Sequence, residues 1–458
     1  MRIDDDAVDR AAAAVAENLA ATARAGDRVG ILCRNGREFF VARRAAIACE
    51  LVVVPLNPGL AAPEIADLVA MSDARLVLAD PELSDAAAAG RRPVVTVDVE
   101  RRAAAPVELP NLGATLVFTS GTTGTPKGCF RPVTTENARA VELTRTYSIT
   151  SDDVHLVSSP MAHSAPGIFS RTCRAAGATT VVMSRFRPEP FLAAIESTRA
   201  TLFFAVPTQI ERLLSLPAAV RERYDISSVR AAIVAGAPFP PPRKRAAAAW
   251  LGDGKLWEFY GSSETGTVAV MPPDELLARP ESVGRPPPGV DIRVLDESGA
   301  ECAPGQIGEI YVRSETVMSH YINAPDPFRD GFLSVGDLGR VDADGYLTLV
   351  DRKHDTIITG GINVYPAEVE HALAEHPDVV AAIAFGVADE HWGQMVAAVV
   401  SGTDDAAGLR TFLRQRIAPF KIPRAFAFAP AGELPITPSG KPNRRAARAR
   451  FIRQLARD

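Results

Sequence analysis

Apolar positions in the first 260 residues follow two alternating spacings. Stretches with an apolar residue every three or four positions, which is typical of a helix packed on a core, are each followed by a short apolar run that suits a buried strand. This alternation predicts α/β layers with mostly parallel strands. The predicted helix and strand pairs are residues 7–25 with 28–33, 37–50 with 51–55, 62–72 with 76–79, 190–197 with 201–205, and 243–251 with 256–259.

The pattern changes after residue 283. Short strand-like runs at 290–295, 307–313, 339–341 and 346–350 are separated by Gly, Pro and Asp turns without long helices, which predicts an antiparallel or barrel-like section. From residue 351 onward, helical and strand-like segments alternate again. The predicted helices are 366–375, 407–417 and 443–455, and the predicted strands are 379–387 and 395–400.

These patterns predict an α/β multidomain protein. The large N-terminal α/β domain would contain layered sheets and a β-rich subdomain, and the last part of the chain would form a small α+β domain of roughly 100 residues, a usual size for an independent unit. We place the boundary between residues 350 and 351, which gives domains of residues 1–350 and 351–458.

Composition and charge narrow the function classes. The net charge of −5 gives no reason to expect nucleic acid, and the five cysteines lack the spacing of a disulfide framework or a zinc site. The three aspartates at 4–6 fit neither a signal peptide nor an acid-poor transit peptide, and no apolar run reaches about 18 residues, so we expect no membrane span and a cytoplasmic location. A monomer and a homodimer are both compatible with the sequence.

A cluster of hydroxyl and glycine residues, closed by one lysine, follows the apolar run 114–118. Glycines let backbone N–H groups converge on an anion, while hydroxyls and a lysine add donors, so the cluster suits a polyphosphate. A Gly/Thr-rich surface turn is the alternative. A Walker-type loop is excluded because proline precedes Lys127 and glycine follows it. The predicted phosphate-binding residues are Thr119, Ser120, Gly121, Thr122, Thr123, Gly124 and Lys127.

Two further segments each carry a carboxylate that suits a part of a nucleotide, either its phosphates through a metal ion or its ribose. Glu264 lies in WEFYGSSETG at 257–266, and a carboxylate beside a triphosphate needs a divalent cation between them, which predicts Mg²⁺. Tyr260 in the same segment offers a ring for stacking on a base. Asp337 lies in GFLSVGDLGRVDADGY at 331–346 and can accept both vicinal hydroxyls of a ribose. Each segment taken alone also fits a structural turn.

Together, these segments resemble the motifs of the adenylate-forming superfamily, which includes acyl-CoA synthetases, peptide-synthetase adenylation domains and beetle luciferases. TSGTTGTPKG at 119–128 resembles the phosphate loop of that family, YGSSE at 260–264 its Tyr-Gly-x-Thr-Glu motif, and VGD at 335–337 its Thr-Gly-Asp motif. Ser263 and Val335 replace the usual threonines, and Ser263 keeps the hydroxyl for phosphate contact. LPITPSGKPNRR at 434–445 resembles the loop whose lysine, here Lys441, bridges the substrate carboxylate and the α-phosphate.

The resemblance assigns further residues of the N-terminal part. SSPMAHSAPG at 158–167 is similar to the segment that places a side chain, here His163, between the acyl pocket and the thiol tunnel, although a structural histidine is the alternative. AGAP at 235–238 is similar to the segment that lines the adenine and acyl pockets through its backbone. The nucleotide and acid would therefore also contact Gly236, Ala237 and Gly261.

The C-terminal part carries the remaining resemblances. Arg352 would reach the ribose or the phosphates, and Gly360 with Gly361 would let a thiol-bearing arm pass close to the backbone. Trp392 matches a position that contacts the CoA adenine in some ligases, with a buried core tryptophan as the alternative. The family pivots its small domain two residues after that arginine, usually on Asp or Lys, and here this residue is His354.

The resemblance implies an ATP- and Mg²⁺-dependent, AMP-forming acid–thiol ligase with a mobile C-terminal domain. The catalytic residues would be Lys441, Glu264 and His163, with Glu264 as the metal ligand. The substrates would be CoA and a carboxylic acid that has no amine group, since the pocket motifs offer no acidic anchor for an α-amine. Transfer to a carrier protein in trans or to an amine remains an alternative, as does a nucleotide-binding regulator without catalysis.

Overall fold

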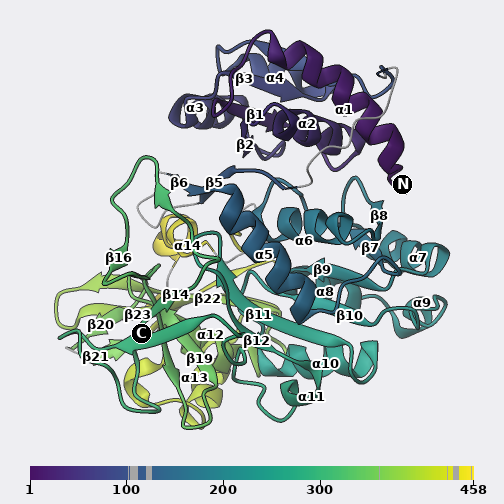
Figure 1. The fold of residues 1–458 in the computed structure, drawn as a ribbon. Coiled ribbons are helices and arrows are strands. Elements are labelled where there is room, and N and C mark those ends of the chain that lie inside the picture. The colour runs from purple at the N-terminus through teal and green to yellow at the C-terminus, as the bar shows by residue number, and fades with distance from the viewer. Residues whose placement is uncertain are drawn as a thin grey trace.

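The computed structural model describes residues 1–101, 103, 112–119, 126–360, 362–430, 432–436, 443–454 and 456–457, with the side chains of 453, 456 and 457 left out. Within these residues, four sheets and their helices form a large N-terminal part and a small C-terminal lobe (Figure 1). No helix of the described chain is long and apolar enough to cross a bilayer.

The first sheet forms from the amino-terminal residues and one later strand. Its elements are α1 (Asp5–Ala20), β1 (Arg28–Leu32), α2 (Arg37–Ala48), β2 (Val52–Pro55), α3 (Ala62–Ser72), β3 (Leu76–Ala79), α4 (Ser84–Ala88), β4 (Val94–Thr96), β5 (Thr115–Thr119), β6 (Lys127–Arg131) and β15 (His320–Tyr321). The strand order is β15-β6-β5-β2-β1-β3-β4. Helices α1 and α2 cover one face of this sheet, and α3 and α4 cover the other. Successive residues of a strand therefore point alternately into the two cores.

The second sheet holds the centre of the molecule. Its elements are α5 (Val133–Thr146), β7 (Val154–Val157), α6 (Ser164–Ala175), β8 (Thr179–Val182), α7 (Pro188–Thr198), β9 (Leu202–Ala205), α8 (Pro207–Leu214), α9 (Ala218–Arg221), β10 (Ala231–Val234), α10 (Pro241–Leu251), β11 (Leu256–Ser262), β12 (Gly266–Met271) and α11 (Pro273–Leu276). The order is β12-β11-β10-β9-β7-β8, and only β12 runs antiparallel to its neighbour. Helices α7, α8 and α10 pack on one face, and α5 and α6 on the other.

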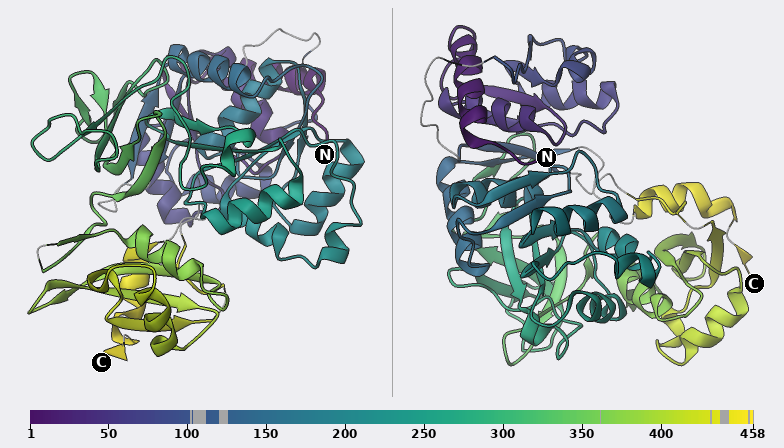
Figure 2. Two further views of the ribbon diagram at one scale, coloured as in Figure 1. Left: turned by 90° about the horizontal axis from the view of Figure 1, so that it is seen from below. Right: turned by 90° about the vertical axis from the view of Figure 1, so that its right-hand side faces the viewer.

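The third and fourth sheets complete the chain. The third is antiparallel and consists of β13 (Asp291–Leu295), β14 (Gly308–Arg313), β16 (Phe328–Arg329), β17 (Phe332–Leu333), β18 (Asp337–Val341) and β19 (Leu347–Arg352). The fourth forms the small lobe seen at the end of the chain in Figure 2. It contains β20 (Ile357–Thr359), β21 (Ile362–Val364), α12 (Pro366–Ala374), β22 (Ala381–Asp389), β23 (Gly393–Ser401), α13 (Ala406–Arg414), β24 (Ala425–Ala429), α14 (Arg444–Phe451) and β25 (Ala456–Arg457).

The predicted fold class is confirmed: layered α/β sheets, a β-rich subdomain and a small α+β lobe are all present. Helices α5 and α6 were not predicted, because buried charged side chains interrupt the apolar positions on their inward faces. The proposed domain boundary at 350/351 falls inside β19, and this division stays a prediction.

Candidate active site

The carboxyl ends of the parallel strands β10 and β11 lie side by side and carry two of the predicted motifs. Gly236 and Ala237 follow β10, and Gly236 has a φ of +92°, a conformation that favours glycine. Gly261 sits at a bulge in β11, where a Cβ atom would lie 2.1 Å from the Gly266 carbonyl oxygen. Only glycine fits there, so the sequence motif has a local steric cause.

Tyr260, Asp337 and Arg352 form one hydrogen-bonded group. Asp337 begins β18 and Arg352 ends β19, and the two residues are register partners. The Arg352 Nε atom lies 3.0 Å from Asp337 Oδ1, and the Tyr260 hydroxyl donates to Asp337 Oδ2. Burial and then Asp337 raise the pKa of Tyr260, so this hydroxyl stays a donor. Each Asp337 oxygen keeps a second lone pair, which a ribose hydroxyl can use.

Glu264 is oriented by two hydroxyl groups from distant parts of the chain. Its Oε1 atom accepts hydrogen bonds from Thr119 Oγ1 and the Tyr321 hydroxyl, both at 2.9 Å. Lys127 Nζ lies 5.3 Å from the centre of the Tyr321 ring. The structure thus brings three predicted residues together around Tyr321, which sequence reasoning missed. The pairing of β15 with β6 brings Tyr321 here, and no local pattern in the sequence indicates that pairing.

The single carboxylate of Glu264 fits a magnesium ion whose other ligands are substrate phosphates and water. Oε2 has no partner among the described residues, while Oε1 is held in place. No group of three or more His, Cys, Asp or Glu residues in the described chain could enclose a metal. Mg²⁺ usually takes one or two carboxylates together with water and substrate phosphates, so a single carboxylate beside a phosphate loop suits it.

Several predicted residues lie outside the part of the chain that the structure describes. The structure does describe both ends of the phosphate loop: Thr119 and Lys127 are register partners in the β5–β6 hairpin. Asn323 fastens the second end, since its Oδ1 accepts from Gly128 N and its Nδ2 donates to Pro126 O, both at 2.8 Å. The residues outside the described ranges are Ser120, Gly121, Thr122, Thr123, Gly124, Gly361 and Lys441.

His163 lies immediately before α6, and its carbonyl oxygen accepts a hydrogen bond from Gly167 N at 3.0 Å. This places it on the loop that follows β7, at the same sheet edge as the ends of β9 and β10. Ser263 lies in the turn between β11 and β12, where its carbonyl oxygen accepts hydrogen bonds from Arg139 Nη2 and Cys129 Sγ. The roles of His163 and Ser263 stay predictions.

The C-terminal lobe presents Gly360 and Trp392 beside a cavity of about 270 Å³. Gly360 has a φ of +55°, and a Cβ atom there would lie 2.9 Å from the Trp392 ring. Trp392 is half-buried and lines this surface cavity, with the Arg424 guanidinium 4.5 Å from the ring centre. It is therefore not a core tryptophan. The other residues around the cavity are Thr359, Ile362, Pro419 and Phe420.

Helix α14 forms ion pairs with the segment that joins the N-terminal part to the C-terminal lobe. Arg444 lies 3.0 Å from Asp355 and 2.9 Å from Glu370, so one guanidinium joins the segment after β19 to α12. His354 lies in the same segment beside Gly336. The residue at the predicted pivot thus packs near the loop that carries Asp337.

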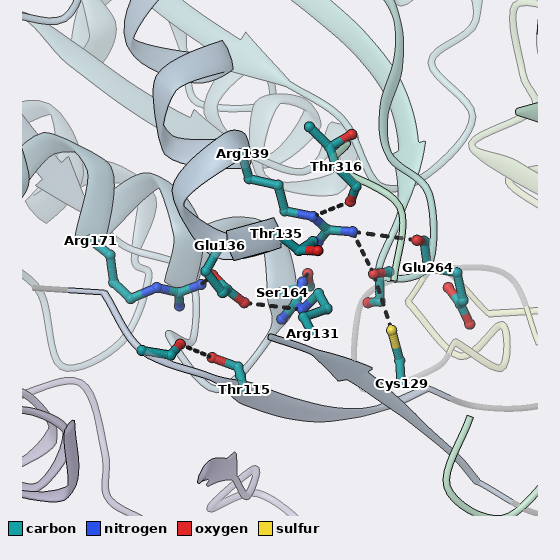
Figure 3. Close-up of polar contacts among 12 residues, drawn as sticks. Thr115, Cys129, Arg131, Thr135, Glu136, Arg139, Ser164, Arg171, Glu264 and Thr316 are labelled. Carbon is teal, nitrogen blue, oxygen red and sulfur yellow. Dashed lines mark hydrogen bonds and ion pairs between the residues drawn. The ribbon is translucent and has the colours of Figure 1, made fainter. Parts of the chain in front are cut away.

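A cluster of buried charges lies between α5, α6 and β6 (Figure 3). Glu136 is fully buried and pairs with Arg131 at 3.1 Å and with Arg171 at 2.5 Å. Arg43 lies close by and makes a 3.4 Å hydrogen bond to Thr115 Oγ1. Burial alone would raise the pKa of Glu136, but Arg131, Arg171 and Arg43 together hold it well below the usual range. One carboxylate therefore balances several guanidiniums.

Comparison with known proteins agrees with this geometry. The model of the AMP-binding enzyme family matches residues 5–322, and the model of the AMP-binding enzyme C-terminal domain matches residues 368–441. The chain belongs to the AMP-binding enzyme family. As a member of this family it is an adenylate-forming ligase of the acid–CoA ligase type, which confirms the class that the motifs predicted.

Three similar proteins illustrate how far the likeness extends. The feruloyl-CoA synthase of an Amycolatopsis species is 35% identical over 453 residues, covering 94% of this chain and 90% of that protein. The amide bond synthetase of Marinactinospora thermotolerans has a TM-score of 0.87 at 33% identity, covering 97% of this chain and 93% of that one. The O-succinylbenzoate coenzyme A synthetase of Bacillus subtilis, in complex with ATP and magnesium ion, has a TM-score of 0.84 at 29% identity, covering 96% and 93%.

Proposed function

We propose that this AMP-binding enzyme joins a carboxylic acid to the thiol of CoA through an acyl-adenylate, with pyrophosphate and AMP released in turn. The observation that carries the proposal is that two carboxylates are oriented around the end of β11: Asp337 is bonded to Tyr260 of this strand, and Glu264 lies in the turn that follows it. Asp337, held by Arg352, would accept the ribose hydroxyls, and Glu264, held by Thr119 and Tyr321, would bind the metal beside the phosphate loop. A nucleoside triphosphate has both of the groups that these carboxylates suit.

In the first step, the ribose hydroxyls would donate to Asp337 while the base lies against Tyr260. A carboxylate oxygen of the acid attacks the α-phosphorus, a P–O bond forms, and the bond to pyrophosphate breaks. Lys127 and Lys441 would neutralise the charge that grows on the phosphate oxygens. Glu264 would hold Mg²⁺ through its Oε2 atom, and this ion supplies further charge neutralisation when bound.

In the second step, the C-terminal lobe would rotate, withdraw Lys441 and bring Gly360 and Gly361 to the acid. The thiol sulfur attacks the acyl carbonyl carbon, the bond to the AMP oxygen breaks, and the thiol proton passes to solvent. Using one site in two conformations is a known purpose of hinged domains. His354, at the predicted pivot, would absorb the backbone change.

The acid would have an apolar body and no amine. The face of β9 and β11 that α6 covers carries stacked and tilted aromatic rings close to the strand ends that bear Gly236 and Gly261. Phe169 lies 5.6 Å from Phe204 and 6.0 Å from Phe259, measured between ring centres. Phe169 and Phe204 are buried in this core, so an apolar or aromatic acid would pack against the half-buried Phe259 and gain from burial there.

The CoA adenine would stack at the cavity beside Trp392. Phe420 also lines this cavity, and Arg424 would contribute a cation for a phosphate group. We predict that Trp392→Ala raises the KM for CoA about tenfold, because stacking on an aromatic ring contributes roughly 1–3 kcal/mol per base. Acid-dependent pyrophosphate release in the absence of CoA should not change. Initial rates at varied CoA concentration test this, with Glu390→Gln, a change at an exposed residue two positions before Trp392, as the control.

The decisive experiment is pyrophosphate release from Mg-ATP across aliphatic, aromatic and amino acids, each with CoA, with an amine or with neither. Mass spectrometry would identify the products. We expect acid-dependent release with an acyl-CoA product. Release that gives an amide only with the amine would favour the second candidate, amide formation, which the likeness to the amide bond synthetase supports. No release with any acid would overturn the proposal and favour a regulator.

A further inference from the structure

Arg139 on α5 lies beneath the turn that carries Glu264, and the proposed mechanism gives it no role. Its side chain is 4% exposed and points away from α6 toward the turn between β11 and β12 (Figure 3). Nε donates to the Thr316 carbonyl oxygen at 2.7 Å, and Nη2 donates to the Ser263 carbonyl oxygen at 2.9 Å and to that of Glu264 at 3.5 Å. All three acceptors are main-chain atoms on two different segments.

These two segments together orient the Glu264 carboxylate. The Glu264 carbonyl oxygen also accepts from Met318 N at 2.7 Å, and the Thr316 hydroxyl donates to the Thr265 carbonyl oxygen at 3.2 Å. The 316–318 segment then leads directly to Tyr321, whose hydroxyl binds Glu264 Oε1. Arg139 is the charged group that joins the Glu264 turn to this segment, so it fixes the direction of both the carboxylate and its tyrosine donor.

The choice of a charged donor has a physical reason. Three carbonyl oxygens that converge in a buried place repel one another, and a planar guanidinium with five N–H groups can satisfy all of them at once. Hydrogen bonds to charged groups stabilise a buried acceptor more than neutral ones do. Without this donor the turn would lose its fixed position relative to Thr119, and the two hydroxyls on Oε1 would no longer be aligned.

We propose that Arg139 is a positioning residue for the metal site: through the Ser263, Glu264 and Thr316 carbonyls it holds the Glu264 carboxylate where Mg²⁺ bound to ATP can reach it. This inference rests on the proposed function, because it takes Glu264 as the metal ligand. It adds that the metal dependence of nucleotide binding is set by a residue that touches neither the metal nor the nucleotide.

The test compares ATP binding by calorimetry with Mg²⁺ and with EDTA in Arg139→Met, Arg139→Lys and Glu264→Gln. We expect Arg139→Met to weaken Mg-ATP binding about tenfold or more, which matches the loss of one to two charged hydrogen bonds. Binding of ATP without metal should change less than twofold. Arg139→Lys keeps the charge but not the fork of donors, so its affinity for Mg-ATP should lie between those of wild type and Arg139→Met. A merely structural role would weaken both forms of ATP alike.

Arg145→Met is the matched control, because Arg145 lies on the same helix and donates to a loop carbonyl, that of Pro288, at 3.2 Å. It should leave both affinities unchanged. The double variant Arg139→Met/Glu264→Gln should bind Mg-ATP no more weakly than Glu264→Gln alone, because Arg139 acts through that carboxylate.

Additive effects in the double variant, or an unchanged metal dependence in folded Arg139→Met, would overturn the inference. If Arg139→Met does not fold, the same comparison in Arg139→Lys decides. A wild-type protein whose ATP affinity does not depend on Mg²⁺ would instead contradict the proposed function, so the two failures are distinguishable.

Discussion

Replacing Glu136 by glutamine should lower the free energy of unfolding of the N-terminal part by about 3–5 kcal/mol, the usual result of removing one partner from a buried ion pair. Glu136 is fully buried, and its two oxygens pair with Arg131 and Arg171. The variant would leave these guanidiniums and that of Arg43 between α5, α6 and β6 without a carboxylate. A buried charge without a counter-charge is among the few causes of so large a loss.

Chemical denaturation followed by tryptophan fluorescence measures this effect, and the transition of the small lobe should be analysed separately because the chain has more than one domain. Glu189→Gln is the matched control, since Glu189 pairs with Arg223 at 2.9 Å on the surface and should change stability little. Adding Arg43→Met to Glu136→Gln should recover part of the loss, because Arg43 makes one long hydrogen bond among the described residues, 3.4 Å to Thr115, and lies near two other guanidiniums. Equal stability of Glu136→Gln and Glu189→Gln would contradict this account of the cluster.

Lys441→Ala should slow acyl-adenylate formation about a thousandfold while leaving acyl transfer from supplied acyl-AMP to CoA within a few-fold of wild type. The reason is that a group stabilising charge only in the adenylation transition state contributes roughly 10²–10³ in rate or more. In the proposed second step this lysine has been withdrawn. Pyrophosphate release measures the first half-reaction, and acyl-CoA formation from synthetic acyl-AMP measures the second.

Lys255→Ala is the control for this variant, because Lys255 lies before β11 and its Nζ donates an exposed 3.5 Å hydrogen bond to the Ser227 carbonyl oxygen. Both of its half-reactions should match wild type. If Lys441→Ala is folded and both half-reactions fall by the same factor, the use of one site in two conformations is wrong.

Much of the site could be predicted because its chemistry is local. Gly261 is required by a bulge within one strand, and Lys127 ends a loop whose composition alone suits phosphate. The family class follows from such short motifs, and the comparisons confirm it. The alternation of helices and strands could also be predicted, since regularly spaced apolar residues line the cores of the first two sheets.

The sequence by itself therefore determined the class of enzyme, the layered fold and the identity of most candidate ligands of the nucleotide, because each depends on neighbours along the chain. Only the tertiary structure decided how they are held. Thr119 and Glu264 meet across 145 positions, Tyr260 and Asp337 across 77, and Arg139 reaches Thr316 across 177. Such contacts depend on strand register and helix packing, and buried charges such as Glu136 and Arg139 interrupt the apolar spacing that identifies a helix. For this reason α5, Tyr321 and the support beneath Glu264 became visible only in the folded chain.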